Sequence, residues 1–225
     1  GRAREGGGRV GLGGASVLTG LRDREGSRLM GGRGENAGVS QVQDDTPTRV
    51  LRAVGNARRT LRAGCTTVRN LGLFVKTGGY LLDVALARAI DAGMIEGPRV
   101  IPAGHAITPT GGHLDPTMFA AFMPGVLELT IEEGIANGND EIRKAVRYQL
   151  KHGAQLIKVC CSGGVMSLTG EAGAQHYSAA ELRVLVHEAH RRALKVAAPT
   201  PGAHAVHPPT PARVDVTAPR LPRAH

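Results

Sequence analysis

Tryptophan is absent from this 225-residue chain, and only 3% of its residues are aromatic. This leaves few side chains on which nucleic-acid bases could stack. No run approaches the ~20 consecutive apolar residues of a membrane-spanning helix, so the sequence predicts no such segment and no membrane partner. The first residues also lack the apolar stretch of a secretory signal. Three cysteines, two of them adjacent, are too few for a disulfide scaffold, and we therefore expect a cytoplasmic protein.

The net charge of +9 is concentrated at the two ends of the chain. Residues 1–35 contain seven arginines and four acidic residues, and residues 200–225 contain three arginines and one acidic residue. The 164 residues between them carry 18 basic and 14 acidic side chains. Because the excess charge does not mark a folded face, we expect no specific nucleic-acid partner, and any such binding would be weak and strongly salt-dependent.

Composition divides the chain into three segments. Residues 1–35 hold 12 of the 32 glycines, and residues 199–225 hold seven of the 13 prolines. Glycine raises the entropy cost of ordering and proline removes backbone donors, so neither end is expected to form regular structure. We therefore predict an irregular segment over 1–28, a folded region over 29–198 and an irregular tail over 199–225.

Between these ends, helical and strand patterns alternate. Asp45 or Thr46 is the expected N-cap of the first helix, whose apolar face would include Val50 and Leu51. Ser178, with a glutamate three residues later, has the form of a capping box. The predicted helices and strands cover, in order, 46–63, 65–71, 80–94, 98–103, 140–152, 155–161, 179–193 and 194–198.

Short apolar strands that alternate with helices are typical of parallel β/α units with right-handed crossovers. The pattern alone fits both a barrel and an open, doubly wound sheet. No Gly-x-Gly-x-x-Gly or Walker-type loop follows a strand, which removes the usual argument for a nucleotide site.

Lys158 is the most informative position for chemistry. It lies near the C-terminal end of an apolar strand, and this strand runs directly into Ser162-Gly163-Gly164. Active sites of parallel β/α folds are built at these strand ends. A buried lysine is costly unless it is paired, neutralised or modified. The alternative is a lysine on an edge strand whose ammonium group reaches water.

Histidines and cysteines offer further candidates. His105 and His113 flank a Gly-containing loop after the second predicted strand, where glycine permits close approach of a ligand. A loop histidine in solvent, or bonded to backbone, is the commoner situation. Cys160 and Cys161 could be reactive at a strand end, but small buried apolar side chains are the simpler interpretation because no neighbouring base is assured.

Four motifs in this order resemble one family. They are GCTTVRNLG at 64–72, AGMIEGPRV at 92–100, TPTGGH at 108–113 and IKVCCSGGVMS at 157–167. Together they resemble the metal-dependent amidohydrolase superfamily, in its imidazolonepropionase-like and Xaa-Pro dipeptidase-like branch. The resemblance covers roughly residues 29–198.

The resemblance implies an α/β fold, specifically part of a (β/α)8 TIM-type barrel with about strands one to five. It also implies hydrolysis of C–N bonds in a small-molecule amide, cyclic amide or dipeptide by zinc or another divalent metal pair. Lys158 matches the family's carboxylated lysine, which bridges the two metals. His113 matches a histidine that lies near the substrate.

Other ligand positions of the family are not matched. The family's His-x-His should lie near 24–28, where the chain reads REGSR, and the ligand after the fifth strand should lie within 199–202, which reads PTPG. Metal sites of this type need several protein ligands, and a complete barrel takes about 250 residues. We therefore expect a truncated, inactive chain that binds little or no metal. The alternative is a non-catalytic β/α module that self-associates, or binds a partner, through an open sheet edge.

Overall fold

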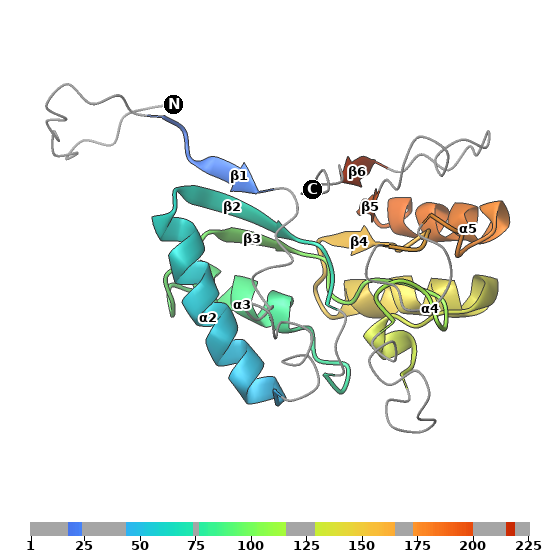
Figure 1. Cartoon of the computed structure of the whole chain (residues 1–225), viewed down its shortest axis with the longest axis horizontal. Coiled ribbons are helices and arrows are strands. Elements are labelled where there is room, and N and C mark those ends of the chain that lie inside the picture. The colour runs from blue at the N-terminus through green and yellow to red at the C-terminus, as the bar shows by residue number, and fades with distance from the viewer. Residues whose placement is uncertain are drawn as a thin grey trace, which may run out of the picture.

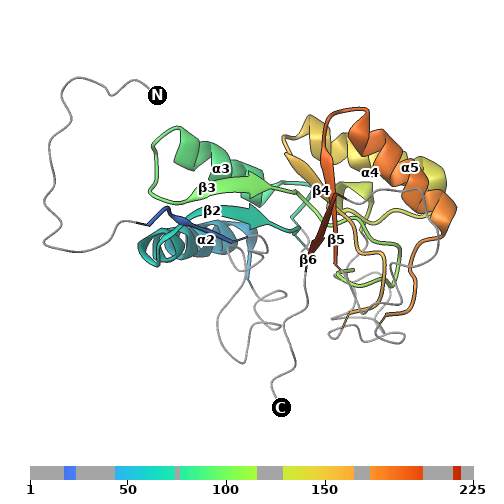
Figure 2. The same ribbon diagram turned by 90° about the horizontal axis from the view of Figure 1, so that it is seen from above.

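The computed structural model describes residues 18–23, 44–73, 77–115, 129–164, 173–199 and 215–218. In these segments the chain forms a mixed α/β structure in which helices flank parallel strands (Figures 1 and 2). The elements are β1 (Leu21–Asp23), α2 (Thr46–Arg62), β2 (Cys65–Asn70), α3 (Leu82–Asp91), β3 (Arg99–Pro102), the 3-10 helix η3 (Ile131–Glu133), α4 (Gly138–Lys151), β4 (Leu156–Lys158), α5 (Ala179–His190), β5 (Lys195–Pro199) and β6 (Val216–Ala218).

Helix α2 begins as the sequence predicts. The side chain of Asp45 accepts a hydrogen bond of 2.9 Å from the backbone N–H of Thr48, which satisfies one donor of the first turn. The predicted inward face is wrong at two positions, because Val50 and Leu51 are exposed. Ala53 and Ala57 are buried against the sheet instead, since small side chains let the helix approach the strands closely.

The first sheet has the order β1-β2-β3 and is parallel throughout. Helices α2 and α3 pack on one of its faces through a small apolar core. That core contains Ala53, Ala57, Val68, Leu86, Ala87 and Val100. In Figure 2 both helices lie beside β2 and β3, as expected for parallel β/α units.

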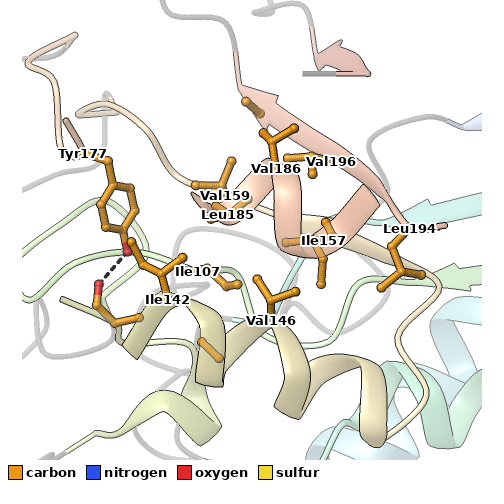
Figure 3. Close-up of a cluster of buried hydrophobic side chains, with 14 residues drawn as sticks. Ile107, Ile142, Val146, Ile157, Val159, Tyr177, Leu185, Val186, Leu194 and Val196 are labelled. Atoms are coloured by element: carbon orange, nitrogen blue, oxygen red, sulfur yellow. Dashed lines mark hydrogen bonds between the residues drawn. The ribbon is translucent and has the colours of Figure 1, made fainter. Parts of the chain in front are cut away.

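The second sheet has the order β4-β5-β6 and is also parallel. Its core against α4 and α5 is the larger one and includes Ile107, Ile142, Val146, Ile157 and Leu185 (Figure 3). The buried hydroxyl of Tyr177 donates a 2.8 Å hydrogen bond to the carbonyl of Ala136, so this phenol enters the core with its polar atom satisfied. The capping box predicted at Ser178 and Glu181 is present at the start of α5.

The two sheets meet at Ile107, which follows β3. Its N–H donates to the carbonyl of Lys158 at 2.8 Å, and its carbonyl accepts from Cys160 at 2.9 Å. Leu71, Ala103, Leu156 and Ala197 form a further buried cluster that spans both sheets. The strands therefore follow one another as in a barrel, but they form no closed barrel within the described residues.

Both ends of the chain, which the composition predicts to be irregular, contribute one short strand each. In the 1–28 segment, β1 pairs with β2, and in the 199–225 segment, β6 pairs with β5. Pairing with a neighbouring strand satisfies the backbone N–H and C=O groups of these residues, and composition alone does not reveal such pairing. The rest of both segments lies largely outside the described residues. In the part that the structure describes, no helix has the length and apolar character needed to span a membrane.

Candidate active site

Lys158 is the last residue of β4 and is 4% exposed. Side chains alternate along a strand, and Ile157 faces the core against α4 and α5. Lys158 therefore shares the opposite face with Leu156, whose contacts are in the cluster that spans the two sheets. The Lys158 side chain therefore lies on the sheet face that points away from α4 and α5. It is also at the C-terminal strand end, where the sequence analysis expects the active site.

His113 lies in the loop after β3 and reaches the loop after β4. A Cβ atom at Gly164 would overlap the imidazole ring of His113, so the ring packs directly on this glycine. The backbone N–H of His113 donates a 3.3 Å hydrogen bond to Nδ1 of His176. The loops that follow two neighbouring strands are thus joined beside the Ser162-Gly163-Gly164 turn.

His176 is a site residue that the sequence analysis did not single out. Its own N–H donates to the carbonyl of Cys161 at 2.9 Å, so its backbone is bonded to the loop after β4 while its ring accepts from His113. Partial burial lowers the pKa of His176, against the opposing effect of the Cys160 carbonyl. A neutral ring keeps Nδ1 available as an acceptor. The sequence feature that could have pointed to His176 is its position two residues before Ser178, which opens the capping box of α5.

The two adjacent thiols are protonated. Complete burial raises the pKa of Cys160 to about 12, although the nearby positive charge of Lys158 acts in the other direction. Burial also raises the pKa of Cys161. Because the thiolate is the reactive and metal-binding form, the geometry favours the interpretation of both as packed side chains rather than nucleophiles.

His105 is a structural histidine. It is fully buried, and its Nε2 lies 2.9 Å from the hydroxyl of Thr77. Burial lowers the pKa of His105 to about 4, so the ring is neutral near pH 7. The expectation of a histidine in solvent is wrong for this residue, because its ring is fully buried.

Asp83 supports the same strand ends and was also missed. Its Oδ2 accepts from Nδ2 of Asn70 at 3.1 Å and from the N–H groups of Ala103 and Gly104 at 3.0 Å each. The carboxyl group is fully buried, and this burial raises its pKa. Asp83 thereby connects α3 to the ends of β2 and β3 and fixes the loop that leads to His113.

Within the described ranges, no three His, Cys, Asp or Glu side chains come together as a metal site. The sulfur donors that follow Lys158 along the chain would first have to lose their protons. Positions 24–28 and 200–202, where further ligands were considered, lie outside the described residues. The described donors therefore do not fit a metal centre.

Comparison with known proteins identifies the family. The sequence profile of the amidohydrolase family matches residues 39–205. The chain belongs to the amidohydrolase family. Members of this family are generally metal-dependent and hydrolyse amide bonds of small molecules. This confirms the resemblance inferred from the four motifs.

Individual relatives agree with this assignment. Ochratoxinase of Aspergillus niger is 38% identical over 144 residues, which are 59% of this chain and 28% of that protein. The crystal structure of the same enzyme superposes with a TM-score of 0.69 and 30% identity, covering 84% of this chain and 44% of the other. A Xaa-Pro dipeptidase with bound methionine gives a TM-score of 0.71 and 29% identity, with the same two coverages. The chain thus spans less than half the length of these relatives.

Proposed function

We propose that this chain is the first part of a (β/α)8 amidohydrolase barrel whose family reaction is hydrolysis of a C–N bond in a small amide or dipeptide. The observation that carries the proposal is Lys158, buried at the C-terminal end of β4 beside the glycine turn on which His113 packs. Such strand ends are the catalytic face of parallel barrels. The similarity to an ochratoxinase and a Xaa-Pro dipeptidase supports the same reaction class.

In this proposal, Lys158 stands at the position of the family's carboxylated lysine, and His113 faces the substrate. In a family member with the full ligand set, the lysine matching Lys158 would hold a metal pair, and that pair would supply an activated water and polarise the scissile carbonyl. Asp83 fixes the ends of β2 and β3, and His176 holds the backbone of His113. These contacts hold the loops at the strand ends in place and require no metal to do so.

We further propose that this chain by itself binds no metal pair, carries Lys158 as an unmodified amine and has no turnover. The sequence lacks histidine at 24–28, and a proline follows Ala198 in β5. One lysine carbamate without partners cannot hold a metal against water, because such sites need several fixed ligands.

Metal analysis of the purified chain, after incubation with excess zinc and desalting, tests this proposal. We expect less than one zinc per chain, no lysine carbamate by mass spectrometry and no cleavage of Xaa-Pro dipeptides. Lys158→Ala is the matched control and should give the same zinc content. Two zinc ions per chain that are lost in Lys158→Ala would contradict the proposed absence of a metal pair while supporting the role of Lys158.

A non-catalytic, self-associating module remains a second proposal, which β1 favours. This strand is at the edge of its sheet in the described part of the chain, and all three of its residues are exposed, Leu21 by 61%. Edge strands present unpaired backbone groups to other chains. Sedimentation velocity over a 100-fold concentration range tests this idea: a defined oligomer that Leu21→Lys dissociates supports it, and a monomer throughout contradicts it.

A further inference from the structure

An open surface cavity of about 610 Å³ lies on the helical side of the molecule, between α3 and α4, and its lining residues Ala85, Arg88 and His152 are exposed. Leu81, Val84 and Ala85 contribute its apolar lining, and Tyr148 of α4 and His152, the residue after α4, line its other side. Neither Lys158 nor His113 lines it, so it is distinct from the candidate active site. Its volume falls in the range of about 300–1,000 Å³ that small-molecule sites occupy.

The cavity holds one permanent charge, the guanidinium of Arg88 on α3. A Cβ atom at Gly153 would lie 2.9 Å from Nη2 of Arg88, so the side chain crosses to the C-terminal end of α4 and rests on this glycine. No carboxylate of the described residues forms an ion pair with Arg88. His152, the residue before Gly153, adds nitrogen atoms at the same end of the cavity.

Tyr148 shapes the part of the wall beside His152. Its hydroxyl donates a 3.0 Å hydrogen bond to the carbonyl of Gly79, and its ring lies 4.3 Å from that of His152, centroid to centroid. Glu133 binds the N–H of Gly79 from outside the cavity, and no acidic side chain lines it. The wall of the cavity therefore combines the rings of Tyr148 and His152 with aliphatic side chains and the cationic group of Arg88.

We propose that this cavity binds a small carboxylate with an aromatic or bulky apolar body. The carboxylate would pair with Arg88 and accept from His152, while the apolar body contacts Leu81, Val84 and the ring of Tyr148. Guanidinium matches a carboxylate in charge and bidentate geometry. Few convergent polar groups on an apolar wall are the usual features of a small-molecule site. This proposal does not depend on the proposed function.

Calorimetric titration of the full chain with 2-naphthoate tests the proposal, with uncharged 2-naphthamide as the matched ligand. We expect naphthoate to bind at least tenfold more tightly than the amide, because a hydrogen bond to a charged group is worth about 1.5–3 kcal/mol. Backbone amide resonances of Leu81, Val84 and His152 should shift during the titration.

Three variants distinguish binding in the cavity from non-specific attraction to surface charge. Arg88→Gln should weaken naphthoate binding about tenfold and leave naphthamide unchanged, while Arg58→Gln, an exposed arginine on α2, should change neither. Ala85→Trp fills the cavity from an exposed helical position and should abolish both. Equal binding of acid and amide, equal effects of Arg88→Gln and Arg58→Gln, or resonance shifts confined to other regions would overturn the proposal. Far-ultraviolet circular dichroism confirms that each variant is folded.

Discussion

The imidazole of His113 packs on the Cα atom of Gly164, and this contact joins the loops that follow β3 and β4. Any side chain at position 164 must displace the ring. We expect Gly164→Ala to lower the free energy of unfolding by about 1–3 kcal/mol, the usual cost of overpacking. Urea denaturation measures the loss, and the His113 ring resonances should shift with it.

Gly55→Ala is the matched control for this substitution. Gly55 lies inside α2, and its added methyl group would meet only the end of Arg59 at an ordinary contact distance of 3.6 Å. Replacing a helical glycine by alanine is expected to stabilise by roughly 0.5–1 kcal/mol. If both alanine variants change stability in the same direction and by the same amount, the packing of His113 on Gly164 does not explain the effect.

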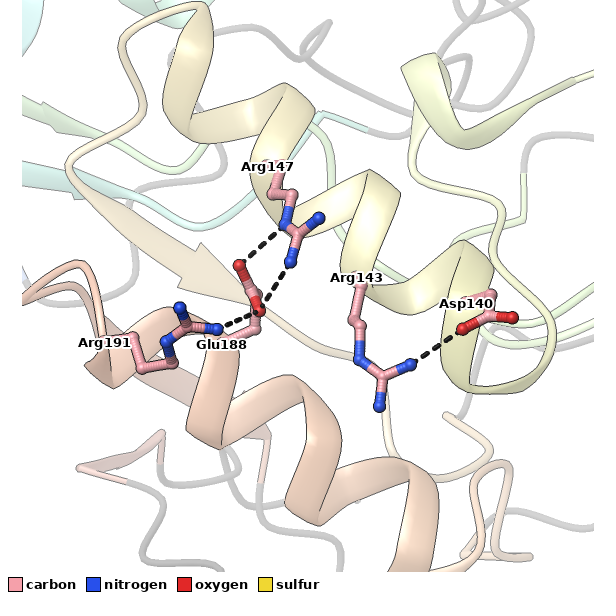
Figure 4. A network of polar contacts seen from close by, with 5 residues as sticks. All are labelled: Asp140, Arg143, Arg147, Glu188 and Arg191. Carbon is pink, nitrogen blue, oxygen red and sulfur yellow. Dashed lines mark hydrogen bonds and ion pairs between the residues drawn. The ribbon is translucent and has the colours of Figure 1, made fainter.

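Glu188 connects α4 and α5 and should make stability depend on pH. It accepts from Nε of Arg147 at 2.8 Å and from Nη2 at 3.2 Å, and it also contacts Arg191 (Figure 4). The bonds from Arg147 lower the pKa of Glu188. Its stabilisation is therefore complete above the ordinary glutamate pKa of 4.5 and is lost as the pH falls through the lowered value.

We expect Glu188→Gln to cost about 1 kcal/mol at pH 7, since both arginine partners are largely exposed and screened by solvent. The cost should disappear near pH 2, as measured by chemical denaturation at both pH values. Arg143→Gln removes the exposed pair with Asp140 and should change stability by less than about 0.5 kcal/mol. A pH-independent effect of Glu188→Gln would contradict the role of its charge.

Local pattern predicts the elements of this chain but not always their buried faces. Asp45 and Ser178 cap their helices as predicted, because a cap depends on residues within one turn. Val50 and Leu51 were placed inward by periodicity, yet Arg49 and Asn56 are buried in α2 instead. Which stripe of a helix is covered depends on where the sheet lies, and that is a tertiary property.

The candidate site shows the same limit. Lys158 could be predicted because a lysine in an apolar strand is conspicuous within seven residues of sequence. His176 could not, because its contact with His113 joins residues 63 positions apart. Asp83 was hidden for a similar reason, since its partners at Ala103 and Gly104 become neighbours only when β2 and β3 pair.

His105 should destabilise the fold in mild acid. Burial lowers its folded-state pKa to about 4, whereas an unfolded histidine titrates near 6.5. Between these values the unfolded chain binds more protons, so the free energy of unfolding must fall as the pH falls from 6.5 to 4, by up to about 3 kcal/mol. The difference between wild type and His105→Gln, measured by urea denaturation at pH 7.0, 5.5 and 4.5, isolates this contribution from other titrating groups.

Thr77→Val serves as the control for His105. It removes the hydroxyl that lies 2.9 Å from Nε2 but leaves the buried ring in place, so the dependence on pH should persist. Only His105→Gln should be less sensitive to acid than the wild type. An unchanged slope in that variant would show that His105 does not titrate with the lowered pKa.

Cys160 should react with alkylating agents only when the chain unfolds. Its side chain is fully buried and its pKa is raised to about 12, so at pH 8 it is both inaccessible and protonated. Cys65 is only partly buried and provides an internal comparison. Mass spectrometry after brief iodoacetamide treatment should find Cys65 modified and Cys160 unmodified in buffer, and both modified in urea. Equal labelling of the two thiols in buffer would contradict the buried, unreactive state that the packing of β4 assigns to Cys160.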